Sequence, residues 1–283
     1  MKRNLIGLVV FLTGVCIIAY LLHHYNSADP LVAVVIGFVV NIITAPVYTV
    51  LVEGFYALRQ LPLVCKTQVL YRNKQVRLSM SYLFRIRVND KYLLVKNSRG
   101  NYYQLVGGAY KTLPGSEKIF KKLMIVPDRK INTDHGIAKK DLRFMLPGRN
   151  VLAIIRWFHS REDREISQWR EFCEELLTTG ILKDRNIFRY IDYSYAGTIQ
   201  TPMQKAKNIN CQEILIYEIF DLLPNDEQLP ELLALQHMGD SEQVKWADAI
   251  IINTLGLDER TKSTPYEIGA HTKWAINLKY VKE

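Results

Sequence analysis

The sequence predicts an α+β protein in which a transmembrane hairpin of two helices precedes a domain with a mixed sheet. Three observations support this prediction: two long apolar segments near the N-terminus, stretches of alternating polar and apolar residues farther on, and two segments with helical spacing among those stretches. Charged residues become frequent only after about residue 60. We therefore expect a hairpin at residues 1–60 and one domain at 61–283, which is long enough for its own core.

The two N-terminal segments, residues 5–22 and 31–52, contain no charged residue. Each has about the 20 apolar residues that a helix needs to cross a bilayer. A short polar link joins them, and basic residues stand before the first segment and after the second. The positive-inside rule then places both termini in the cytoplasm. A cleaved signal peptide is the competing interpretation of the first segment.

The remaining elements follow from periodicity. Alternation of polar and apolar residues predicts four strands, at residues 76–88, 91–96, 102–110 and 210–220. Helical spacing appears over residues 162–179 and 240–255. The order of these elements predicts a mixed sheet with helices packed on its faces. The four scattered cysteines form no CxxC pair, so neither a zinc site nor a disulfide framework is expected.

The segment 162–179 combines an apolar face with an acidic one. Its apolar residues recur at helical spacing and should face the core: Trp169, Phe172, Cys173 and Leu176. Glu171, Glu174 and Glu175 have the same spacing and should cluster on another face, where no lysine follows at i+4 to offset their charge. A bound magnesium ion would supply the positive charge that offsets these carboxylates. An acidic face held apart by water is the alternative.

The wider spacing around these glutamates is specific. Glu162 precedes Arg170 by eight residues, and Arg170 is followed directly by the acidic cluster, which gives E-x7-R-E-U-x-E-E with U apolar. This pattern resembles the Nudix box of hydrolases that cut nucleoside diphosphates linked to another moiety. The glycine that the box requires is displaced, since Arg156 stands at its position. The best match is the pair Gly107 and Gly108, with Gly148 as a second candidate.

On that match the box is split by an insertion at residues 109–161. A split box resembles the SMODS-associated Nudix domain of CBASS, the bacterial antiphage systems that signal through cyclic oligonucleotides. Residues 141–182 and the closing "IGAHTKWAINL" are similar to that family as well. With the N-terminal hairpin, the chain resembles the two-transmembrane Nudix effector of these systems.

The resemblance implies a Nudix-like α/β/α sandwich on a protein of the bacterial inner membrane. It implies an effector that senses a cyclic oligonucleotide, made by a synthase of the same system, and then oligomerises and disrupts the membrane, with no role for DNA. The alternative is a membrane-anchored, magnesium-dependent pyrophosphohydrolase acting on a nucleoside diphosphate derivative. The family pattern assigns Glu171, Glu174 and Glu175 to Mg²⁺ and pairs Arg170 with Glu162. Glu218 is a candidate for a general base outside the box, although a glutamate on a strand more often faces solvent.

The insertion 109–161 holds twelve Lys or Arg and four Asp or Glu, so its net charge of 12 − 4 = +8 accounts for nearly all of the +9 of the chain. A phosphate-rich ligand would be attracted to such a segment. The residues expected to bind it are Gly107, Gly108, Lys121, Lys122, Lys139, Lys140 and Arg143. Anionic lipid head groups or a merely solvated surface are the other interpretations of this charge.

Overall fold

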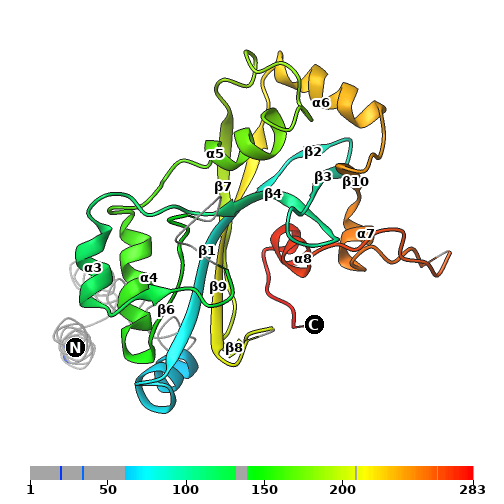
Figure 1. Cartoon of the computed structure of the whole chain (residues 1–283). Coiled ribbons are helices and arrows are strands. Elements are labelled where there is room, and N and C mark those ends of the chain that lie inside the picture. The colour runs from blue at the N-terminus through cyan, green and yellow to red at the C-terminus, as the bar shows by residue number, and fades with distance from the viewer. Residues whose placement is uncertain are drawn as a thin grey trace. The chain divides into compact units, whose positions relative to one another are not determined.

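The computed structural model describes Tyr20, Val34 and residues 61–131, 139–207, 209–259 and 261–282. The chain divides into two compact units, residues 1–65 and 66–283, and each is described by itself. The boundary expected from the sequence lies between residues 60 and 61. All the elements labelled in Figure 1 belong to the second unit.

The predicted location in the inner membrane, with both termini cytoplasmic, needs correction. Within the part of the chain that the structure describes, no helix is long and apolar enough to span a bilayer. Helices α4 (Val151–Ser160) and α6 (Gln228–His237) have ten residues each, which corresponds to about 15 Å against a hydrocarbon core of about 30 Å. The spans expected at 5–22 and 31–52 lie outside the described residues, apart from Tyr20 and Val34.

The second unit is built on one ten-stranded mixed sheet (Figure 1). Its strands are β1 (Gln75–Arg85), β2 (Arg87–Val88), β3 (Lys91–Lys96), β4 (Tyr103–Ala109), β5 (Val126–Pro127), β6 (Arg143–Pro147), β7 (Asp192–Gln200), β8 (Gln204–Lys205), β9 (Gln212–Leu223) and β10 (Val244–Ala247). Among these strands, β1 and β9 pair in parallel and the other pairs are antiparallel. The predicted α+β class and mixed sheet are therefore confirmed.

The central strand β1 changes its partner halfway along one edge. Its first half pairs with β6 and its second half with β4, while β9 follows nearly the whole of the other edge. Met80 marks the change: its N–H donates to Leu142 O at 2.9 Å, and its carbonyl accepts from Tyr110 N at 3.1 Å. The end of β4 and the start of β6 therefore meet beside the middle of β1, where the candidate site lies.

Helices cover the sheet on both faces. They are η1 (Lys66–Leu70), α3 (Ser116–Lys122), η3 (Gly148–Asn150), α4, α5 (Trp169–Phe172), η4 (Cys173–Leu177), α6, α7 (Ala249–Asn253) and α8 (Ala270–Asn277). Leu83 of β1 belongs to a core cluster with Ile252 of α7 and Trp274 of α8. The next residue, Phe84, points to the opposite face, and its ring lies 6.0 Å from that of Phe172 in α5.

Two predicted helices are shorter than expected. Only Trp169–Leu177 of the segment 162–179 is helical, and its last five residues form the π-helical turn η4. The segment 240–255 splits into β10, which pairs with β3, and the short helix α7. Asp248 ends the strand and caps the helix, since its side chain accepts from Ile251 N at 2.9 Å.

Candidate functional site

A cleft of about 430 Å³ lies where β4 ends and β6 begins. Gly107 and Gly108 of β4 and Arg143 of β6 line it on the side of the sheet. Helix α5 and turn η4 supply the acidic wall, Glu171, Glu174 and Glu175. The structure thus brings together the glycine pair, one arginine of the insertion and all three glutamates that the sequence singles out.

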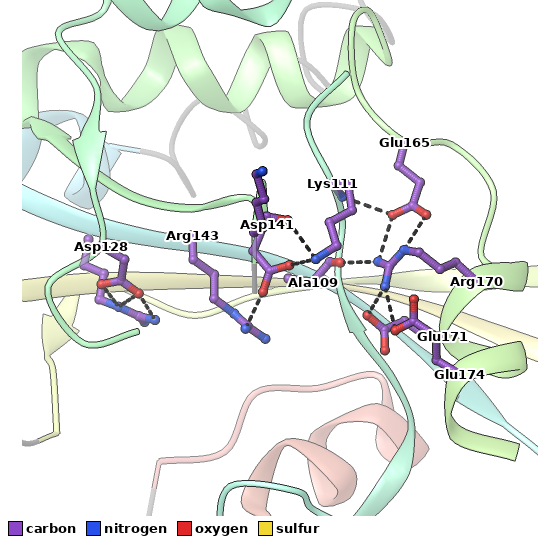
Figure 2. Close-up of polar contacts among 11 residues, drawn as sticks. Ala109, Lys111, Asp128, Asp141, Arg143, Glu165, Arg170, Glu171 and Glu174 are labelled. Atoms are coloured by element: carbon purple, nitrogen blue, oxygen red, sulfur yellow. Dashed lines mark hydrogen bonds and ion pairs between the residues drawn. The ribbon is translucent and has the colours of Figure 1, made fainter. Parts of the chain in front are cut away.

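Arg170 ties this acidic wall to the sheet (Figure 2). Its Nε donates to Glu165 Oε1 at 2.9 Å and its Nη1 to Glu171 Oε1 at 2.6 Å. Its Nη2 donates to the carbonyl of Ala109 at 2.8 Å, at the end of β4. A longer contact of 3.4 Å joins Nη1 to Glu174. One guanidinium therefore fixes the helix, the strand and a neighbouring loop together.

The predicted pair between Arg170 and Glu162 is wrong, because Glu165 takes that place. The Glu165 carboxylate accepts from Arg170 and also from Lys111 N at 3.0 Å. Glu162 is exposed in the turn after α4. The turn has positive φ at Arg161, so the chain leaves helical geometry before Glu162. Spacing alone could not identify Glu165, since its contact depends on the path of that loop.

The two glycines of the pair are required for different reasons. Gly107 N donates to Glu175 Oε2 at 2.8 Å, and at its φ of 148° a Cβ would lie 2.1 Å from the carbonyl oxygen of Tyr82. A Cβ at Gly108 would lie 2.2 Å from Glu171 Oε1. Gly107 is therefore required by the backbone of β1, and Gly108 leaves room for the Glu171 carboxylate. The second candidate, Gly148, instead packs against the backbone of Tyr71.

Burial and mutual repulsion alter the acidity of the wall. Burial raises the pKa of Glu175 to about 8, opposed by the Gly107 hydrogen bond and assisted by the charges of Glu171 and Glu174. Burial also raises the pKa of Glu171, although the charge of Arg170 works against this. Glu175 is therefore protonated to a larger extent at neutral pH than an exposed glutamate.

As they lie, these carboxylates do not form a complete magnesium site. Within the described ranges, no three His, Cys, Asp or Glu side chains are arranged to hold a metal ion. Glu171 is bound by Arg170 and Glu175 by Gly107, while the Glu174 side chain is 47% exposed. A hard divalent cation needs ionised oxygen ligands that converge. The three predicted metal ligands thus lie in one wall of the cleft, but they are not arranged around one metal position.

The predicted basic residues separate into three groups. Arg143 lines the cleft, and its Nη1 donates to Asp141 Oδ2 at 2.6 Å. Lys139 and Lys140 line a second hollow of about 300 Å³ next to the cleft. Lys121 and Lys122, at the end of α3, line neither hollow.

Glu218, the candidate general base, is buried on β9 away from the cleft. It accepts a hydrogen bond from the Tyr110 hydroxyl and lies 3.7 Å from Arg164 Nη2. Sequence analysis missed Gln104, a buried residue of the cleft whose Oε1 accepts from Asn97 Nδ2 at 2.8 Å. No signal in the sequence sets this glutamine apart from other strand residues.

Comparison with known proteins identifies the family of the chain. No curated protein matches the chain. The family model of the SMODS-associated Nudix domain matches residues 75–276. This range is more than half of the 283 residues and includes every element of the cleft. The chain therefore belongs to the family of SMODS-associated Nudix domains.

Proposed function

We propose that this domain is the receptor of a CBASS effector and binds a cyclic oligonucleotide in the cleft. The proposal rests mainly on the acidic wall, whose Glu171 and Glu175 are already bound by Arg170 and Gly107. Carboxylates that are already bound in this way hold the cleft in shape, and they are not free to bind a metal ion for cleavage. The cleft volume lies within the range of small-molecule sites, and Arg143 offers charge-assisted hydrogen bonds to phosphate.

The ligand would act as a signal by changing the association of the protein. A ligand favours assembly only when it binds the assembled state more tightly than the single chain. The functional partner in this proposal is a cyclic-nucleotide synthase of the same system, and DNA has no part in it.

A magnesium-dependent pyrophosphohydrolase acting on a nucleoside diphosphate derivative is the second candidate function. The raised pKa of Glu175 favours the hydrolase, because a carboxyl with a pKa of about 8 changes its protonation near neutral pH, as a general acid or base must. Glu171, Glu174 and Glu175 would then supply oxygen ligands after Glu171 had left Arg170.

One experiment separates the two functions. The full-length protein is mixed with cyclic di- and trinucleotides and with ADP-ribose, each with magnesium. Calorimetry measures binding, light scattering measures the association state, and chromatography measures breakdown of the ligand. We expect a cyclic oligonucleotide to bind, remain intact and increase association. Breakdown of ADP-ribose, without any response to cyclic ligands, would support the hydrolase.

Substitution of two glutamates of the acidic wall separates the receptor from the hydrolase further. In a hydrolase, Glu174→Gln combined with Glu175→Gln would weaken magnesium binding and stop cleavage. In the receptor, we expect the same double variant to bind the cyclic ligand within about twofold of wild type, because glutamine has the size of glutamate and its amide oxygen can still accept from Gly107 N, so the wall keeps its shape. Loss of cyclic ligand binding together with loss of magnesium binding would contradict the receptor.

A further inference from the structure

The second hollow adjoins the cleft and differs from it in character. The two share Asp141 and Arg143 in their walls. Phe120 of α3 and Phe144 of β6 line the second hollow, with ring centroids 5.4 Å apart, and Val126 of β5 lines it as well. Apolar and aromatic walls of this kind suit the flat face of a nucleobase.

Charge is concentrated at the rim of this second hollow. Lys139 and Lys140 line it, and the carboxylate of Asp141 is already shared by two cations, Lys111 and Arg143. One carboxylate cannot neutralise two cations. A phosphate at this rim would supply the missing negative charge.

Arg143 lies in the wall between the two spaces, and within the described residues its guanidinium uses only part of its hydrogen-bond donors. Its side chain is 14% exposed, and Figure 2 shows a single contact, from Nη1 to Asp141. Among the described residues, the one hydrogen bond found for its guanidinium is the one from Nη1 to Asp141. Burial lowers the pKa of this guanidinium, the charge of Asp141 opposes this effect, and the charges of Arg99 and Arg77 add to it, so an anion would relieve repulsion among these cations.

We propose that the second hollow binds a second nucleotide unit, and that Arg143 binds the phosphodiester that joins it to the unit in the cleft. This inference rests on the proposed binding of a nucleotide in the cleft and specifies the length of the ligand. One unit lies against the glycine pair and the acidic wall. The base of the next lies between Phe120 and Val126, with its own phosphate at Lys139 and Lys140. The domain would then select linked nucleotides over mononucleotides.

The first test fills the second hollow. The probes are the four nucleoside 5′-monophosphates and the linear dinucleotides pApA, pGpG, pCpC and pUpU, titrated into the full-length protein by calorimetry. We expect wild type to bind a dinucleotide at least about tenfold more tightly than its monophosphate. Val126→Trp should remove this advantage and leave monophosphate binding within about twofold, because an indole at Val126 occupies the hollow but not the cleft. Val281→Trp is the control, since Val281 is 39% exposed like Val126 and lines neither space.

The second test changes the charge at the rim. Lys139→Gln combined with Lys140→Gln should weaken dinucleotide binding about tenfold and leave monophosphate binding unchanged. Lys121→Gln combined with Lys122→Gln is the matched control, because these lysines line neither space and the variant should bind both probes like wild type.

The outcomes separate the second site from the proposed function. If Val126→Trp keeps the preference for dinucleotides, or loses both probes equally, the second site is wrong while nucleotide binding in the cleft stands. If both lysine pairs have the same effect, the rim has no special role and the inference fails. If wild type binds none of the eight linear probes but binds a cyclic oligonucleotide, the second site is wrong while the proposed function stands. If it binds neither, nucleotide binding in the cleft is wrong, and the second site with it.

Discussion

Two glycines with positive φ show how space, as well as backbone conformation, sets the cost of a side chain. Gly107 and Gly180 have φ values of 148° and 74°. A Cβ at Gly107 would meet the Tyr82 carbonyl, whereas no atom lies within 4 Å of a Cβ at Gly180. We expect Gly180→Ala to lower the free energy of unfolding by about 1 kcal/mol and Gly107→Ala by about 3 kcal/mol or more, in urea denaturation. Equal losses would contradict the close approach of β4 to β1.

Glu175 gives the stability of the domain a pH dependence. Its pKa is raised from 4.5 to about 8 by burial, so between these values the folded protein holds a proton that the unfolded chain has released. The free energy of unfolding therefore falls as the pH rises through this window, by up to about 1.4 kcal/mol per pH unit. We expect Glu175→Gln, which cannot titrate, to gain about 1–2 kcal/mol relative to wild type between pH 6 and pH 8 in urea denaturation.

The control for this prediction is Glu174→Gln on the same turn. The Glu174 side chain is 47% exposed, so its difference from wild type should stay within about 0.5 kcal/mol over the same pH range. A gain of the same size in both variants would assign the pH dependence to the whole acidic wall and not to Glu175.

At the scale of elements, the segment from α5 to η4 is held by part of its apolar face. Phe172 is fully buried, and its ring lies 5.7 Å from that of Phe188. Trp169, expected on the same face, is 36% exposed. We expect Phe172→Ala to lower the free energy of unfolding by about 3–5 kcal/mol and Trp169→Ala by about 1–2 kcal/mol, measured by urea denaturation. Similar losses would restore the interpretation of one evenly buried face.

The elements that the sequence predicts well are those whose signal is local. Strands β1 and β9 lie within two or three residues of the predicted ranges 76–88 and 210–220, because runs rich in Val, Ile and Tyr favour strands wherever they pair. The spacing of apolar residues over 240–255 predicts one helix, because this spacing contains no information about the strands with which a segment can pair. Val244–Ala247 becomes a strand by pairing with β3, about 150 residues earlier in the chain, and no local pattern reports such a contact.

The residues of the candidate site likewise divide into those that a local motif predicts and those that depend on distant contacts. The acidic wall and the glycine pair were predictable, because a motif fixes their residue types and order. The exchange of Glu162 for Glu165 was not, since it depends on a loop that leaves helical geometry at Arg161. The special position of Arg143 among twelve basic residues depends on where β6 joins β1, which composition does not reveal.

At the scale of the whole domain, residues 109–161 are a structural part of the fold and not a peripheral insertion. The segment contributes β6, which pairs with β1, and helices α3 and α4. At its centre, Asp128 accepts hydrogen bonds from Arg77 Nε at 3.0 Å and Arg77 Nη2 at 2.8 Å. The same guanidinium donates to Glu213 of β9 at 2.9 Å through Nη1. One buried arginine therefore joins the segment to the two central strands.

This connection makes the stability of the domain depend on Asp128. The Arg77 side chain is 4% exposed and that of Asp128 fully buried, so Asp128→Asn leaves a buried cation with one carboxylate fewer and should lower the free energy of unfolding by about 3–5 kcal/mol. Asp90→Asn is the matched control, because the Arg87–Asp90 pair is exposed and asparagine tolerates the φ of 64° at that position. It should cost no more than about 0.5 kcal/mol. Urea denaturation of the full chain measures both. A peripheral insertion would unfold by itself and leave the main transition of Asp128→Asn at the wild-type midpoint, whereas a segment built into the fold shifts that transition as a whole.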